Sequence, residues 1–117
     1  MRPHKKLEVW KAGMKLTSDI YASVNTFPDT EKYGLVSQMK RASVSIPANI
    51  AEGAARQTKK EFRQFLFIAR GSLSELDTHL ELSLNLNLIE KEIFRDLSNQ
   101  INKINAMLNG LLKSLTS

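Results

Sequence analysis

A proline inside an apolar helical pattern is the feature of this sequence that most restricts its fold. Pro47 lies in the segment Ser43–Arg56, whose apolar residues recur at intervals of three and four. Proline has no backbone N–H, so the carbonyl of Ser43, four residues earlier, loses its helical partner. The apolar pattern continues in phase from Ile46 to Ile50, so we expect a helix that bends around its neighbours. We favour this structural role for the proline over a catalytic one.

Four segments of the chain have the apolar spacing of amphipathic helices, at about residues 7–26, 30–53, 58–85 and 88–115. No segment has the alternating pattern of a half-buried strand. Helices of similar length joined by short connections are typical of an antiparallel bundle. The sequence therefore predicts one all-α domain over residues 1–117, an up-down-up-down four-helix bundle.

Helix ends are marked by residues with known preferences there. Pro28 is expected to end the first helix, because the residue before a proline avoids the α conformation. Gly53 is expected to end the second helix as a C-terminal cap. The expected N-terminal caps are Asp29 or Thr30 for the second helix, Thr58 with Glu61 for the third, and Asn87 with Glu90 for the fourth.

Each helix has one apolar stripe that is expected to face the bundle core. Four asparagines of the last helix lie off its stripe and are expected to face water. They are Asn99, Asn102, Asn105 and Asn109. The predicted stripe of the first helix is Trp10, Gly13, Met14, Thr17, Tyr21 and Val24, with Leu7, Ile20 and Phe27 at its margins. That of the second helix is Val36, Met39, Ser43, Ile46 and Ile50, and that of the third is Phe62, Leu66, Ala69, Leu73, Leu76 and Leu80, with Phe65 beside it. That of the fourth helix is Ile93, Leu97, Ile101, Ile104, Leu108, Leu111 and Leu115.

The second and third helices carry a further set of small and apolar residues behind their core stripes. A solvated helix back normally carries lysine, glutamate and glutamine, so these residues indicate contact with another surface. A bundle of four helices has nothing to cover that side, and we expect a homo-oligomer. The alternative is that the alanines are simply good helix formers. The predicted interface residues are Val44, Ala48, Ala51, Ala55, Phe67, Gly71, Ser74, Thr78 and Leu82.

Several short motifs occur in order along the chain. They are Val-Trp at residues 9–10, Phe-Pro with Glu-x-Tyr-Gly-Leu over 27–35, Ser-Ile-Pro-Ala-Asn-Ile-Ala-Glu-Gly with Arg56 over 45–56, and Phe-x-x-Phe-Leu-x-x-Ala-x-Gly-Ser-x-x-Glu over 62–75. Together they resemble the four-helix-bundle family encoded in intervening sequences of bacterial 23S rRNA genes, and are similar to the accessory protein of diversity-generating retroelements. The resemblance implies a pentameric ring, with intervening-sequence RNA or a reverse transcriptase as partner.

The net charge of +5 is concentrated in residues 38–70. In an up-down bundle the second loop lies at the same end as both chain termini, which gathers basic side chains there. Such an end attracts phosphates, and without aromatic side chains between the basic ones we expect backbone binding with little sequence preference. The alternative is a structural oligomer with a protein partner and incidental charge. The predicted nucleic-acid-binding residues are Lys5, Lys6, Arg56, Lys59, Lys60 and Arg63.

Residues for catalysis, metals or cofactors are not assembled in the sequence. Di-iron bundles need Glu-x-x-His on two helices, but Leu76 stands three residues before His79, and His4 lies in the N-terminal tail. We therefore expect no enzyme, no metal and no cofactor. The absence of cysteine is typical of a cytoplasmic chain, and no apolar run is long enough to span a membrane. Asn49, Glu52 and Glu75 are interpreted as buried polar ties, with Arg41 or Arg70 as partners of the two acids.

Overall fold

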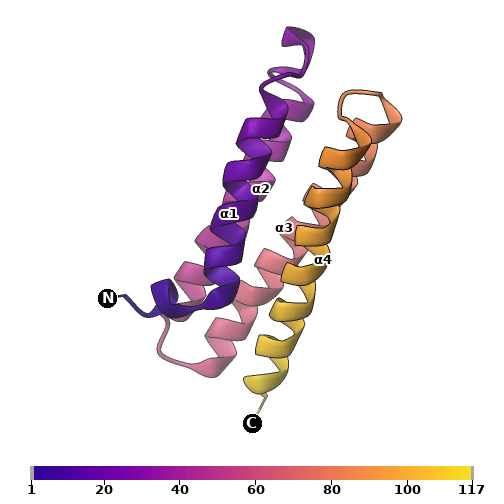
Figure 1. Ribbon diagram of the computed structural model, residues 1–117. Coiled ribbons are helices and arrows are strands. Elements are labelled where there is room, and N and C mark those ends of the chain that lie inside the picture. Colours follow the sequence, from indigo (N-terminus) through magenta and orange to yellow (C-terminus); the bar gives the residue numbers. More distant parts are fainter. Residues whose placement is uncertain (1, 117) are drawn as a thin grey trace.

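The computed structural model describes residues 2–116, which form four α-helices and two short 3-10 turns (Figure 1). Consecutive helices run in opposite directions, and no strand occurs in the described residues. The predicted up-down-up-down bundle is therefore confirmed. The elements are η1 (Pro3–Lys6), α1 (Glu8–Val24), η2 (Asp29–Glu31), α2 (Leu35–Ala54), α3 (Lys59–Asn85) and α4 (Lys91–Ser114).

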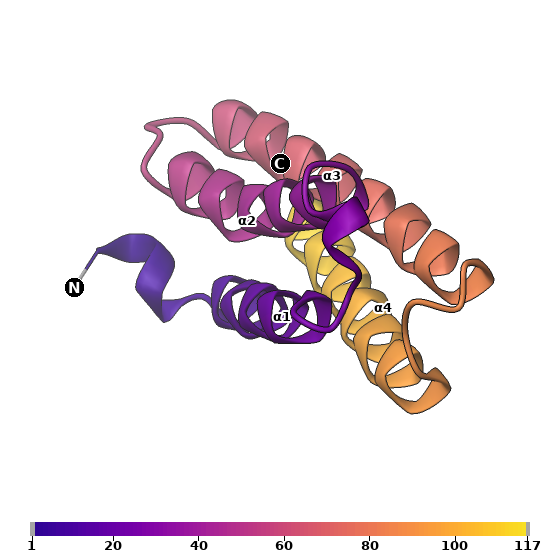
Figure 2. The same cartoon turned by 90° about the horizontal axis from the view of Figure 1, so that it is seen from above.

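The four helices form a closed square in which each packs against two neighbours. The contacts are α1 with α2, α2 with α3, α3 with α4, and α4 with α1 (Figure 2). The first turn, η1, packs against α1 and α2. The bundle measures 46 × 22 × 22 Å, and Figure 1 shows both chain ends at the same end as the α2–α3 connection. None of the helices in residues 2–116 is long and apolar enough to cross a membrane.

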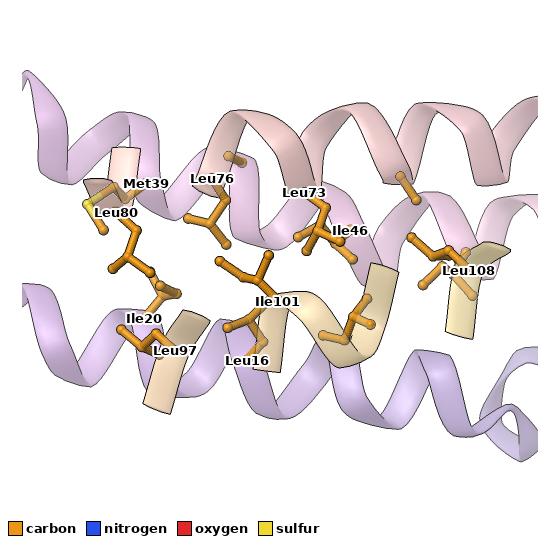
Figure 3. Packing of buried hydrophobic residues seen from close by; sticks show 14 of the residues in the cluster. Leu16, Ile20, Met39, Ile46, Leu73, Leu76, Leu80, Leu97, Ile101 and Leu108 are labelled. Carbon is orange, nitrogen blue, oxygen red and sulfur yellow. The ribbon is translucent and has the colours of Figure 1, made fainter. Parts of the chain in front are cut away.

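All four helices contribute apolar side chains to one core, which Figure 3 shows pointing toward one another. The predicted stripe of α2 is entirely buried, and that of α3 is buried except for Phe62, which is half-buried. These two stripes are confirmed. The buried apolar residues are Val9, Leu16, Ile20, Val24, Phe27, Val36, Met39, Ala42, Ile46, Ile50, Leu66, Ala69, Leu73, Leu76, Leu80, Leu97, Ile101, Ile104, Leu108 and Leu112.

The predicted stripe of α1 is partly wrong. Met14 and Tyr21 are 45% and 41% exposed, whereas Leu16, which was not predicted, is fully buried. At Gly13, which is buried as predicted, α1 packs against α2. A Cβ at that glycine would lie 3.5 Å from ring atoms of Pro47, so the smallest residue of α1 faces the proline. Leucine and isoleucine then enter the core, and the long amphipathic side chains stay at its edge.

The stripe of α4 differs from the prediction at both ends. Ile93 is 40% exposed, and Leu112 is buried where Leu111 was expected, with Leu111 and Leu115 only half-buried. The four central residues of the stripe are buried as predicted.

Pro47 lies within α2, which continues through it as predicted. The hydroxyl of Thr17 in α1 lies 2.9 Å from the carbonyl oxygen of Ser43 and donates to it, while also lying 2.9 Å from the carbonyl of Gly13. The carbonyl that proline leaves without a helical partner is therefore satisfied by a neighbouring helix. This bond explains a threonine on the core side of α1.

Three predicted helix ends are corrected by the structure. Gly53 is a buried residue within α2, which ends at Ala54, and so is no cap. Neither Asp29 nor Thr30 caps α2, because η2 occupies that stretch and α2 begins after Gly34. Asn87 has a φ of 57° in the last connection, and the cap position of α4 falls to Glu90. Asp29, Thr30 and Asn87 lie in turns outside the helices, whereas Gly53 lies inside α2.

Gly53 is required by close packing of α2 on α3. A Cβ there would lie 2.8 Å from Cβ of Phe65 and 3.2 Å from the carbonyl oxygen of Phe62. Gly53→Ala is therefore expected to lower the free energy of unfolding by about 1–3 kcal/mol, as overpacking does. Urea denaturation measures the change. The matched control is Gly110→Ala, in open space on α4, which should raise stability by about 0.5–1 kcal/mol.

Candidate nucleic-acid interface and self-association face

The predicted basic residues lie at the end of the bundle that holds the chain termini and the α2–α3 connection (Figure 1). Lys5 and Lys6 are exposed on η1, and Lys59 and Lys60 are exposed in the first turn of α3. Within the described residues none of these four ammonium groups forms an ion pair. Their charges are therefore presented to solvent at one end of the molecule.

The turn η1 is held in place by the ring of His4. This ring lies edge-on to Trp10 at 5.1 Å between centroids, and the backbone N–H of Leu7 donates to the carbonyl of His4 at 3.0 Å. Trp10 is half-buried against the core, so the aromatic contact ties η1 to the bundle. This contact places the two lysines of η1 beside α1 and α2.

The two predicted arginines are engaged within the molecule. Arg56 donates to the Glu52 carboxylate at 2.6 Å, and its guanidinium lies 4.8 Å from the ring centre of Phe65. Arg63 is half-buried and donates to the carbonyl of Leu112, near the C-terminal end of α4, at 3.5 Å. Both keep N–H groups for a ligand, since a guanidinium has five donors. Sequence reasoning could not detect these contacts, because they depend on distances between helices.

The expectation that no aromatic residue lies among the basic ones is wrong. The ring of exposed Phe67 has the guanidinium of Arg70 4.9 Å from its centre and that of Arg63 5.6 Å away. Residues three and four apart on a helix are neighbours, so the spacing of Arg63, Phe67 and Arg70 was the available signal. Phe67 was instead assigned to the self-association face.

The start of α3 carries the predicted capping box. The hydroxyl of Thr58 accepts from the backbone N–H of Glu61 at 3.1 Å and donates to the Glu61 carboxylate at 2.9 Å. The Glu61 carboxylate thus lies at the N-terminal end of α3, where its negative charge offsets part of the attraction of that helix end for anions. Any phosphate binding at this end depends on the lysine side chains more than on the helix amides.

The predicted self-association face is largely exposed. Val44 on α2 and Leu82 on α3 are 43% and 44% exposed, and a Cβ at Gly71 would meet nothing within 4 Å. Ile68, also exposed, was missed because it lies to one side of the predicted stripe. The α2 part of this face reaches η1, since Ala48, Ala51 and Ala55 line a hollow of about 470 Å³ together with Arg2, Pro3, His4, Glu52 and Arg56.

Polar side chains join α2 to α3 along their outer groove. The hydroxyls of Ser45 and Ser72 lie 2.8 Å apart, and the amide of half-buried Asn49 donates to the carbonyl of Ser45 at 2.8 Å. Asn49, interpreted as a buried polar tie, is half-buried, and its amide bonds to Ser45 of the same helix.

The interpretation of Glu52 and Glu75 as buried ties is wrong, because both are exposed. Glu52 pairs with Arg56, and Glu75 lies 3.7 Å from Nε2 of buried His79. Neither expected arginine partner takes part, since Arg70 donates to Asn109 of α4 instead.

The opposite end of the bundle contains an acidic groove between α1 and α4. The Asp19 carboxylate accepts from Lys15 at 2.7 Å and from Gln100 at 2.8 Å. The hydrogen bond from Lys15 lowers the pKa of Asp19, and the same bond raises the pKa of Lys15. Asp19, Glu92 and Asp96 line one hollow of about 420 Å³, which would repel phosphates. In the described residues, no three histidine, aspartate or glutamate side chains are grouped to hold a metal ion.

Comparison with known proteins gives a family and a fold. The model of the 23S rRNA-intervening sequence protein family matches residues 5–110. A crystal structure of a protein of unknown function from the S23 ribosomal protein family of Bacteroides thetaiotaomicron is 27% identical, with a TM-score of 0.80. The alignment covers 90% of this chain and 98% of that one. No curated protein matches the sequence.

Proposed function

The chain belongs to the 23S rRNA-intervening sequence protein family, and on this premise we propose that it is a small, self-associating cytoplasmic bundle that binds nucleic-acid backbone through its basic end. The observation that carries the proposal is the arrangement of four exposed lysines, none in an ion pair within the described residues, at one end of the bundle. These residues are Lys5, Lys6, Lys59 and Lys60.

Lysine side chains suit this role because phosphate binding needs charge more than fixed geometry. A lysine ammonium is a compact charge on a flexible stem and follows a phosphate backbone without reading its bases. The acidic groove at the opposite end limits the attraction to one end of the molecule. Binding should therefore show strong salt dependence and little preference between sequences.

A variant lacking the four lysines tests the proposal. Replacing Lys5, Lys6, Lys59 and Lys60 with alanine should weaken binding to all sequences about equally. It should also reduce the slope of log affinity against log salt by up to about 3.6 units, since each of the four lost phosphate contacts removes roughly 0.7–0.9. Fluorescence anisotropy with labelled RNA and DNA at several salt concentrations measures both quantities. Exposed lysines contribute little to stability, so folding should be nearly unchanged.

The control variant removes the same net charge elsewhere. Lys32, Lys91 and Arg95 are exposed toward the other end of the bundle and Lys103 is exposed midway along α4, so their replacement with alanine should leave most of the binding intact. Equal loss in the two variants would mean that only net charge matters and that the site is wrongly assigned. A wild-type protein that does not bind at low salt would contradict the proposal itself.

A second function is favoured by the exposed apolar face of α2 and α3. In this alternative the chain is a structural homo-oligomer that binds a protein partner, and its charge is incidental. A scaffold for an enzyme that acts on nucleic acid, such as a reverse transcriptase, would combine nucleic-acid binding with binding of a protein partner. Salt-independent co-purification with a protein partner, together with no binding to RNA or DNA, would favour the alternative.

A further inference from the structure

One face of α3 carries basic and aromatic side chains in alternation. Lys60, Arg63, Phe67, Arg70 and Ser74 follow at intervals of three, four, three and four, which places them in one row. The row begins at the basic end of the bundle and follows α3 for roughly 20 Å, at about 1.5 Å per residue. It therefore extends the proposed binding site along the side of the molecule.

The middle of this row is fixed by α4. Arg63 donates to the carbonyl of Leu112 at 3.5 Å, and Arg70 donates to the side-chain oxygen of Asn109 at 3.0 Å. Their guanidinium groups lie 5.6 and 4.9 Å from the ring centre of exposed Phe67. Ring and guanidinium groups thus form a pre-arranged stack, and both surfaces can stack on a nucleic-acid base. The remaining guanidinium N–H groups can donate to phosphates.

Two asparagines of α4 line the same groove. Asn102 and Asn105 line a hollow of about 160 Å³ between α4 and α3, together with Ser74 and Asp77. A side-chain amide offers both donors and an acceptor, which is what the edge of an unpaired base requires. The negative charge of Asp77 would repel phosphates, so it marks the far end of the row.

We propose that the groove between α3 and α4 binds a single strand of nucleic acid. Phosphates contact Lys60, Arg63 and Arg70, and a base stacks on Phe67 or on the guanidinium groups beside it. This inference rests on the proposed function and adds a preference for unpaired strands, because a duplex keeps its bases stacked on one another. Charge complementarity favours this occupant over a second copy, since burying Phe67 in a dry interface would also bury two arginines.

Phe67→Leu tests the inference because it keeps apolar volume and removes the aromatic face. The variant is expected to bind a single-stranded oligonucleotide about tenfold more weakly, the loss typical of one stacked base. Its affinity for a duplex of the same sequence should change by less than about twofold, since backbone contacts remain. Anisotropy measures both affinities for RNA and for DNA, and a 2-aminopurine base in the strand reports stacking. The control is Ile68→Leu, an exposed neighbour outside the row.

Each contrary outcome has a distinct meaning. A wild type that binds single strands and duplexes equally, with no effect of Phe67→Leu, would overturn the inference and leave backbone binding at the lysines intact. No binding of either nucleic acid at low salt would remove both proposals. Dissociation of an oligomer by Phe67→Leu in sedimentation would assign the residue to the self-association face and overturn the inference.

Discussion

Leu16→Ala is expected to lower the free energy of unfolding by about 2–5 kcal/mol, the usual cost of removing a buried leucine. Leu16 is fully buried, and Figure 3 shows its side chain within the core, near Ile101. Met14→Ala, two residues earlier on the same helix, should cost less than about 1 kcal/mol because Met14 lies at the surface. Urea denaturation of the two variants and the wild type gives the comparison.

The two variants test the rotation of α1 directly. Both remove a long apolar side chain from the same helix, so helix propensity and the unfolded state change in similar ways. A larger loss for Met14→Ala than for Leu16→Ala would mean that α1 presents the side predicted from the sequence. A loss for Leu16→Ala below about 0.5 kcal/mol would mean that this part of the core is not closely packed.

The rotation of α1 could not be obtained from the sequence because two stripes compete in it. Met14 and Tyr21 lie on one, Leu16 and Ile20 on the other, and both have helical spacing. In α2 and α3 most of the large aliphatic side chains fall on a single stripe, so periodicity selected the buried side. Which side of α1 is buried depends on how it packs against α2 and α4, and periodicity does not contain that information.

Helix ends were less predictable than helix faces. Gly53 has the residue type of a C-terminal cap, but its lack of a side chain serves the contact with Phe62 and Phe65. The bond from Thr17 to the carbonyl of Ser43 joins residues 26 apart and could not be predicted, although the unpaired carbonyl itself was. Local preferences thus indicate where a residue type is needed, and tertiary packing decides what it does.

In the candidate site, too, some features could be predicted from the sequence and others depend on contacts between helices. The order and direction of the helices were enough to predict that the lysines lie at one end of the bundle. The ion pair of Arg56 with Glu52 and the contact of Arg63 with a carbonyl of α4 depend on side-chain distances, so the sequence did not predict them. The same distances place Phe67 between two arginines, which turns a predicted interface residue into a candidate stacking surface.

Charge placed on the exposed face of α2 is expected to prevent the proposed self-association. Val44 and Ala48 are exposed and one helical turn apart, and Val44 lies beyond the hollow beside η1. If this face packs against another copy, Val44→Glu with Ala48→Glu would bury two unpaired carboxylates there, at a cost of several kcal/mol. Sedimentation velocity at micromolar concentration should show a multi-subunit wild type and a monomeric variant. Circular dichroism should be unchanged, because neither residue contributes to the core.

The control for this variant places the same two charges on the other side of the bundle. Ser18 of α1 and Asn99 of α4 are exposed, so Ser18→Glu with Asn99→Glu should leave the oligomer intact. A monomeric wild type at micromolar concentration would contradict self-association and would make the alanines of α2 simple helix formers. If the wild type and both variants are equally large, the copies associate through another surface. The exposed Val44 and Leu82 would then need a different partner.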